Sequence, residues 1–115
     1  MATEVYIGKY RLASRVLAAP MSGVTDLPFR RVLQKFEPGL VVSEMVASET
    51  LLKGCSETTA RAAGKGDIDP LVIQLVGREA SWMAKGAKLA EDAGADIIDI
   101  NMGCLLYTSP SPRDA

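Results

Sequence analysis

The chain has 115 residues, of which 48% are hydrophobic and 23% charged, and its 13 Lys and Arg nearly balance 14 Asp and Glu. This composition is typical of a globular protein and argues against disorder. The balanced charge gives no electrostatic reason to expect nucleic-acid or membrane-surface binding by this segment. The chain has no histidine, which excludes a Cys–His or Ser–His catalytic pair and a histidine-containing zinc site. We therefore expect no bound metal.

The sequence shows neither a membrane-spanning segment nor a signal peptide. No stretch approaches the roughly 20 apolar residues of a membrane span. The N-terminus lacks the apolar core and cleavage site of a signal peptide. The two cysteines, Cys55 and Cys104, are far apart and form no C-x-x-C pair. The sequence predicts a cytoplasmic protein with reduced thiols and no membrane partner.

The first part of the chain predicts a hairpin, a strand and a helix. Residues 4–14 alternate around a Gly-Lys pair, which indicates a short β-hairpin. The apolar run "RVLAAP" over residues 15–20 predicts a buried strand that ends at its proline. Residues 23–36 then have helical spacing with a proline in the first turn. Three apolar side chains of this helix are expected to face inward: Val32, Leu33 and Phe36.

The rest of the chain continues the alternation of strands and helices. Three further apolar runs predict strands over residues 38–45, 70–77 and 95–103. A short helix is expected over residues 46–54 and a longer one over residues 78–94, each stopped by a glycine. Between them, residues 56–69 are polar and predict either a loop or a frayed helix.

Four strands alternating with helices indicate an α/β fold with a parallel sheet and right-handed crossovers. The strands are continuous apolar runs, which is typical of strands buried on both faces. No G-x-G-x-x-G fingerprint or P-loop is present, so a barrel is favoured over a dinucleotide-binding fold.

Polar or sulfur-containing residues occur near the end of each apolar run. In barrels of eight βα units, the reaction site lies at the carboxyl ends of the strands. The sequence therefore predicts a site built from these strand ends. The candidates are Pro20, Met21 and Ser22; Ser43, Glu44 and Met45; Gln74; and residues 101–104.

Each candidate also has a simpler interpretation. Gln74 is explained equally well as the partner of a buried backbone group. Glu44 is solvated or ion-paired in many such positions, and Asn101 is a common turn former. A free cysteine such as Cys104 is usually a small buried hydrophobe. The alternative is a catalytic thiol, presented by a sharp turn that Gly103 permits.

Four linked motifs resemble those of the tRNA-dihydrouridine synthases, most closely the bacterial B-type subgroup. They are "LAAPMSGVTDLPFR", "LVVSEM", "VIQLVG" and "DIIDINMGC", which begin at residues 17, 40, 72 and 96. The resemblance extends from about residue 5 to residue 104, in order and at family spacing. The joint presence of all four motifs makes it specific.

This resemblance implies a (β/α)8 TIM barrel that binds FMN. Residues 1–104 would be its N-terminal half, about four βα units preceded by a short β-hairpin. It also implies reduction of the C5–C6 double bond of uridines in tRNA, with NADPH as the reductant. Pro20, Met21 and Ser22 would lie against the flavin, and Gln74 would hydrogen-bond its ring. Asn101 would lie beside the flavin and the target uracil.

Cys104 would be the general acid that protonates C5 of the uracil. Proton donation requires the neutral thiol, and burial near an apolar strand end disfavours the thiolate. The target base must leave the tRNA stack to reach such a pocket.

The family pattern stops after Cys104. Residues 105–115, "LLYTSPSPRDA", are expected to be a non-family tail, either a disordered terminus or a sequencing artefact. We expect the chain alone to be inactive and to bind FMN weakly or not at all. Two alternatives stay open: a related FMN TIM-barrel reductase that acts on a free pyrimidine, and a non-catalytic half-barrel that dimerises.

Overall fold

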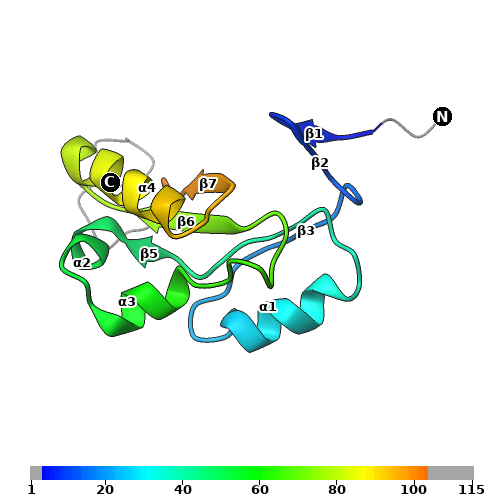
Figure 1. The fold of residues 1–115 in the computed structure, drawn as a ribbon, viewed down its shortest axis with the longest axis horizontal. Coiled ribbons are helices and arrows are strands. Elements are labelled where there is room, and N and C mark those ends of the chain that lie inside the picture. Colours follow the sequence, from blue (N-terminus) through cyan, green and yellow to red (C-terminus); the bar gives the residue numbers. More distant parts are fainter. Residues whose placement is uncertain (1–3, 104–115) are drawn as a thin grey trace.

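A computed structural model describes residues 4–103, which fold as an α/β structure (Figure 1). The predicted hairpin is confirmed: β1 (Tyr6–Ile7) pairs antiparallel with β2 (Tyr10–Arg11). Gly8 lies between them with φ +58°, a conformation that side-chain-bearing residues rarely adopt. No helix in residues 4–103 is long and apolar enough to cross a membrane.

The remaining strands pair in parallel. β3 (Leu17–Ala18) pairs with β4 (Leu40–Val41), and β6 (Val72–Val76) pairs with β5 (Val46–Ala47) on one side and with β7 (Ile97–Ile100) on the other. An isolated parallel bridge joins Val42 to Val72, so the segment from β4 to β5 runs beside β6 as one irregular strand. The parallel strands therefore neighbour one another in chain order.

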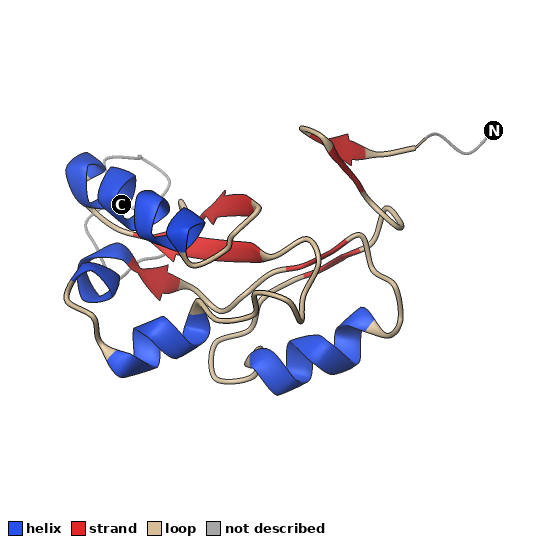
Figure 2. Cartoon of the chain, in the orientation of Figure 1, coloured by secondary structure: helices blue, strands red, loops and turns tan. Residues whose placement is uncertain are grey.

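A helical segment lies in each crossover, as Figure 2 shows. α1 follows β3, α2 and α3 follow β5, and α4 follows β6; their bounds are Leu27–Gln34, Ser48–Leu52, Ser56–Arg61 and Ala80–Asp92. Consecutive parallel strands linked by helices confirm the predicted α/β class. The helix predicted over 46–54 begins two residues late, because Val46 and Ala47 pair with β6 first. Part of the uncertain segment 56–69 is helical, as α3.

The sheet has two different faces. The face toward the helices carries Ile73 and Leu75, which belong to the main core together with Leu51 of α2 and Ala90 of α4. The opposite face carries an apolar cluster at the amino ends of the strands, which the hairpin region covers. Its members are Leu12, Leu40, Val42 and Val72, with Val5 and Ile97 packed against them.

The prediction that residues 15–20 form a buried strand is wrong as to burial. Leu17 in β3 is 51% exposed, whereas all five residues of β6 are buried. The reason is position: β3 pairs only with β4 among the described strands, while β6 has a neighbour on each side. An apolar run does not reveal whether its strand is central or at an edge.

The inward face predicted for α1 is also partly wrong. Val32 and Phe36 are 51% and 80% exposed, although Leu33 packs against the core. Arg30 is fully buried instead, and its Nη2 donates to the carbonyl oxygens of Arg61 and Ala63 at 3.4 and 3.2 Å. Arg30 of α1 therefore packs against the end of α3, on the inward face that periodicity assigned to apolar side chains.

Close packing of α4 on α2 depends on Gly86. A Cβ added there would lie 2.8 Å from Ser48 Oγ and 2.9 Å from Ser48 Cβ. We expect Gly86→Val to lower the free energy of unfolding by about 2–3 kcal/mol through overpacking. The control Ala84→Val introduces the same side chain at a neighbouring exposed position and is expected to cost less than about 1 kcal/mol. Thermal unfolding followed by circular dichroism checks this, and equal losses would contradict it.

Candidate functional site

Three polar side chains meet on one face of the sheet, toward the carboxyl ends of β6 and β7. Gln74 in β6 lies opposite Asp99 in β7, and its Nε2 donates to Asp99 Oδ2 at 2.6 Å. Asn101 follows β7, and its Nδ2 donates to Gln74 Oε1 at 3.2 Å. The structure therefore brings two predicted site residues, Gln74 and Asn101, into direct contact, and it adds a third, Asp99, that the sequence reading did not single out.

Strand alternation explains why these side chains share a face. Val72 and Gln74 are two residues apart in β6, as are Ile97 and Asp99 in β7, so each pair points the same way. Val72 and Ile97 belong to the apolar cluster under the hairpin. This sheet face thus changes from apolar to polar along the strands, with the polar layer toward the carboxyl ends.

The candidates on the second strand form a bulge against β6. From Val42 to Val46 the chain advances four residues, while their partners Val72 and Leu75 are three residues apart. The extra residue lies within residues 43–45, and it reverses the alternation: Val42 belongs to the cluster under the hairpin and Val46 to the main core. Bulges of this kind often re-aim side chains beside functional sites.

The bulge contacts the polar layer directly. Ser43 Oγ accepts from the backbone N–H of Gln74 at 3.0 Å and donates to the carbonyl of Glu44 at 2.9 Å. Met45 Sδ lies 3.9 Å from Asn101 Nδ2. Within residues 4–103, the Gln74 amide contacts the side chains of Asp99 and Asn101 rather than a buried backbone group.

The end of the first strand forms a tight turn. Met21 donates its N–H to Thr25 Oγ1 at 2.8 Å, and its carbonyl accepts from the N–H groups of Val24 and Thr25. Pro20 is half-buried in this turn, while the remaining two first-strand candidates, Met21 and Ser22, are exposed. No hydrogen bond joins these three residues to the Gln74 amide in the described part of the chain.

Glu44 ties this turn to the second strand. Its side chain is buried, and its Oε1 accepts from the N–H of Gly23. Arg61 Nε lies 3.9 Å from the other carboxylate oxygen. The paired interpretation of Glu44 is therefore the one observed. A cavity of about 520 Å³ lies beside it, between the Gly23 turn, the start of α1 and the end of α3.

Two opposing effects act on the charge of the neighbouring Arg30. Burial lowers its pKa, and the carboxylates of Glu44 and Asp26 oppose that change. Glu44 therefore serves two roles in this region: it holds the Gly23 turn and it compensates a buried cation.

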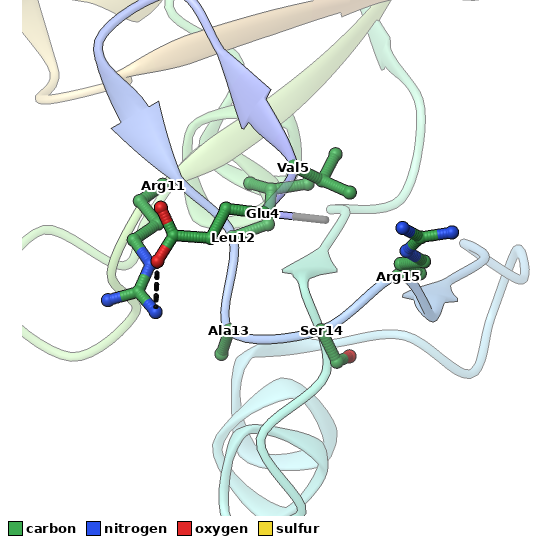
Figure 3. Close-up of a pocket in the computed structure, with 7 residues that line it drawn as sticks. All are labelled: Glu4, Val5, Arg11, Leu12, Ala13, Ser14 and Arg15. Atoms are coloured by element: carbon green, nitrogen blue, oxygen red, sulfur yellow. Dashed lines mark ion pairs between the residues drawn. The ribbon is translucent and has the colours of Figure 1, made fainter. Parts of the chain in front are cut away.

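A second cavity, of about 340 Å³, lies under the hairpin and is lined by residues 4–5 and 11–15 (Figure 3). Its ion pair, Arg11 Nη2 to Glu4 Oε1 at 2.8 Å, is exposed and contributes little to stability. The cavity adjoins Val5 and Leu12, which pack at the amino ends of the strands. It is therefore remote from the carboxyl ends, where βα barrels hold their reaction sites.

The proposed acid, Cys104, lies outside the described residues, which end at Gly103. The backbone N–H of Gly103 donates to Asn101 Oδ1 at 3.0 Å, so Asn101 does form the turn that its alternative interpretation predicted. The other cysteine, Cys55, is exposed just before α3. Residues 4–103 contain no group of three or more His, Cys, Asp or Glu side chains that could hold a metal ion.

The amide pair retains capacity for a ligand. Gln74 Nε2 has a second N–H beyond its bond to Asp99. Asn101 Nδ2 also has a second N–H beyond its bond to Gln74, which makes only a weak contact with Met45 Sδ at 3.9 Å. Such groups suit a planar heterocycle whose edge alternates carbonyl oxygens with N–H groups. A flavin ring and a uracil both have such an edge.

Asp99 and the bulge are the features that sequence reasoning missed. The i, i+2 spacing of Asp99 and Asn101 within a predicted strand already placed both on one face. The bulge had no comparable signal, because it depends on how residues 42–46 pair with β6.

Comparison with known proteins agrees with the motifs. A family model described as dihydrouridine synthase matches residues 16–109. A probable tRNA-dihydrouridine synthase of Rhizobium leguminosarum bv. phaseoli is 57% identical over 91 residues, which is 79% of this chain and 28% of that protein.

Two further relatives show similar coverage. A probable tRNA-dihydrouridine synthase of Rhodobacter capsulatus is 50% identical over 103 residues, covering 87% of this chain and 31% of the relative. The tRNA-dihydrouridine synthase B of Pseudomonas putida is 47% identical over 102 residues, covering 89% and 30%. The chain thus spans about 30% of the length of these curated relatives. No solved structure gave a significant match. The chain belongs to the dihydrouridine synthase family.

Proposed function

We propose that this chain is the N-terminal half of the (β/α)8 TIM barrel of an FMN-dependent tRNA-dihydrouridine synthase. The parallel strands lie in chain order, and helices connect β3 to β4, β5 to β6 and β6 to β7, which supports about four βα units of such a barrel. On this proposal residues 1–104 form the half-barrel, and residues 105–115 are a non-family tail. The observation that carries the proposal is the Asp99–Gln74–Asn101 chain of side chains at the carboxyl ends of adjacent strands.

FMN fits the donors that this layer presents. The free N–H of Gln74 Nε2 would bind a carbonyl oxygen of the flavin ring, and the turn after β3 would place Pro20, Met21 and Ser22 against the ring. Glu44 holds that turn through the N–H of Gly23. When bound and reduced by NADPH, FMN supplies hydride to C6 of the uracil.

The residues that follow β7 would serve the substrate. Asn101 would bind the uracil edge through its remaining N–H and align the base beside the flavin. Cys104, the residue after Gly103, would donate its Sγ proton to C5, so that one hydride and one proton saturate the C5–C6 bond. Solvent then reprotonates the thiolate. That the uracil belongs to tRNA is supported by the names of the relatives, and a base in tRNA must be unstacked to enter the pocket.

The chain alone lacks neighbours that such a barrel would supply. Leu17 on β3 and Ile100 on β7 are 51% and 60% exposed, and both strands lie at edges of the described sheets. Exposed apolar edge strands favour association of copies rather than binding of a cofactor. The balanced charge also leaves the basic surface needed for tRNA to the part of the enzyme outside this chain.

The first test compares the chain alone with a chimera. In the chimera, residues 5–104 replace the corresponding N-terminal segment of the Rhizobium relative. We expect the chimera to bind FMN stoichiometrically, and with NADPH to reduce uridine in an unmodified tRNA transcript. We expect the chain alone to do neither. Flavin absorbance after gel filtration and dihydrouridine analysis are the measurements. A yellow, active 115-residue chain, or a folded chimera without FMN, would contradict the proposal.

The same proteins separate the two alternatives. A reductase of free pyrimidines would make the chimera reduce free uracil in preference to tRNA. A non-catalytic dimerising half-barrel would make the purified chain elute as a discrete folded dimer, which light scattering would identify.

The role of the thiol is tested with Cys104→Ala in the chimera. We expect uridine reduction to fall by about a hundredfold or more, because the proton donor is lost. FMN content and the rate of flavin reduction by NADPH should be unchanged, since the thiol acts on the uracil. Cys55→Ala, at the exposed position before α3, should leave all three quantities unchanged. Equal activity of Cys104→Ala and the parent chimera would rule out the thiol as the acid.

A further inference from the structure

We propose that Asp99 is a positioning residue that sets the orientation of the Gln74 amide and, through it, of Asn101 and the backbone leading to Cys104. This inference rests on the proposed function of the same site. It assigns a role to a side chain that lies in β7 and is expected to touch neither flavin nor uracil.

The carboxylate of Asp99 determines which way the Gln74 amide faces. An ionised carboxylate only accepts hydrogen bonds, so the NH₂ end of the amide must turn toward it. Gln74 Nε2 lies 2.6 Å from Asp99 Oδ2, which is within hydrogen-bonding distance. A flipped amide would set its oxygen against the carboxylate oxygen, with no proton between them.

The contact with Asn101, at the oxygen end of the Gln74 amide, requires the same orientation of that amide. Asn101 Nδ2 donates to Gln74 Oε1 at 3.2 Å, which requires the oxygen end of Gln74 to face away from Asp99. A flip would place two NH₂ groups against each other at this contact. Both contacts therefore favour one arrangement, and only the carboxylate is unable to adapt by flipping itself.

The fixed orientation of these amides extends to the backbone of Gly103, the residue before the proposed acid. Because Asn101 donates through Nδ2, its Oδ1 is left to accept from the Gly103 N–H at 3.0 Å. One continuous set of hydrogen bonds thus runs from Asp99 through Gln74 and Asn101 to the backbone beside Cys104. The remaining N–H groups of both amides then have fixed directions for ligand binding.

The surroundings make this role specific to Asp99. Gln74 is only 8% exposed, so little of its side chain reaches solvent. Its backbone N–H is held by Ser43 Oγ. In residues 4–103, Asp99 makes no ion pair, and its side-chain hydrogen bond is the one to Gln74. Its contact with this amide is therefore the interaction that a substitution would remove.

The test uses Asp99→Leu and Asp99→Asn in the chimera. Leu has a similar size but no acceptor, and we expect it to weaken FMN binding at least about tenfold and to shift the visible flavin absorption. Asn keeps one acceptor oxygen, and we expect it to restore affinity to within about threefold of the parent. The controls Asp92→Leu and Asp92→Asn, at an exposed position at the end of α4, should leave both quantities unchanged. Fluorescence quenching of FMN gives the affinity.

A second measurement does not depend on flavin. In ¹⁵N spectra of the flavin-free chimera, the Gln74 side-chain NH₂ should give two well-separated proton resonances with slowed solvent exchange. Asp99→Leu should bring them toward the values of a free amide, and Asp99→Asn should preserve the separation.

If the parent chimera shows two well-separated NH₂ resonances but no FMN binding, the proposed function fails while the role of Asp99 stands. A folded Asp99→Leu chimera with unchanged NH₂ resonances would overturn the role of Asp99. Where Asp99→Leu fails to fold, loss of the separation in folded Asp99→Asn would overturn it equally.

Discussion

The buried strand β6 is the constraint on which the rest of the structure depends. It pairs with β5 on one side and with β7 on the other, and all five of its residues are buried. Four of the five are aliphatic, and Gln74 is the exception. A buried amide without partners costs free energy, so the strands on either side must supply hydrogen-bonding groups at that level. Ser43, Asp99 and Asn101 do so.

The bulge in the second strand follows from the same requirement. It brings Ser43 Oγ to the backbone of β6 and lets Val42 and Val46 serve opposite faces of the sheet. A regular strand would put those two valines on one face. The bulge also leads into Glu44, whose carboxylate reaches the turn after β3. Through this one irregularity, the second strand is hydrogen-bonded both to the turn after β3 and to β6.

A buried cation supports the outer side of this arrangement. Arg30 is fully buried, and its Nη2 holds two carbonyl oxygens near the end of α3. Its Nε and Nη1 have no hydrogen-bond partner among the described residues, and each such buried N–H costs about 1–3 kcal/mol. The nearby Glu44 carboxylate offsets part of the cost of burying the charge. Holding the β3–α1 turn in place therefore has an energetic cost, which the aliphatic core offsets.

The sequence by itself determined the class of fold, the order of strands and helices, the family, and two members of the polar layer, Gln74 and Asn101. These depend on local signals: apolar runs, helical spacing, glycine stops and motifs. Three features were decided only by the tertiary structure: the exposure of Leu17 and Phe36, the burial of Arg30, and the bulge at residues 43–45. Each depends on which segment lies beside another, and residues distant in sequence supply those neighbours. Asp99 lies between the two cases, because its face could be read from alternation, while its bond to Gln74 required the register of β6 and β7.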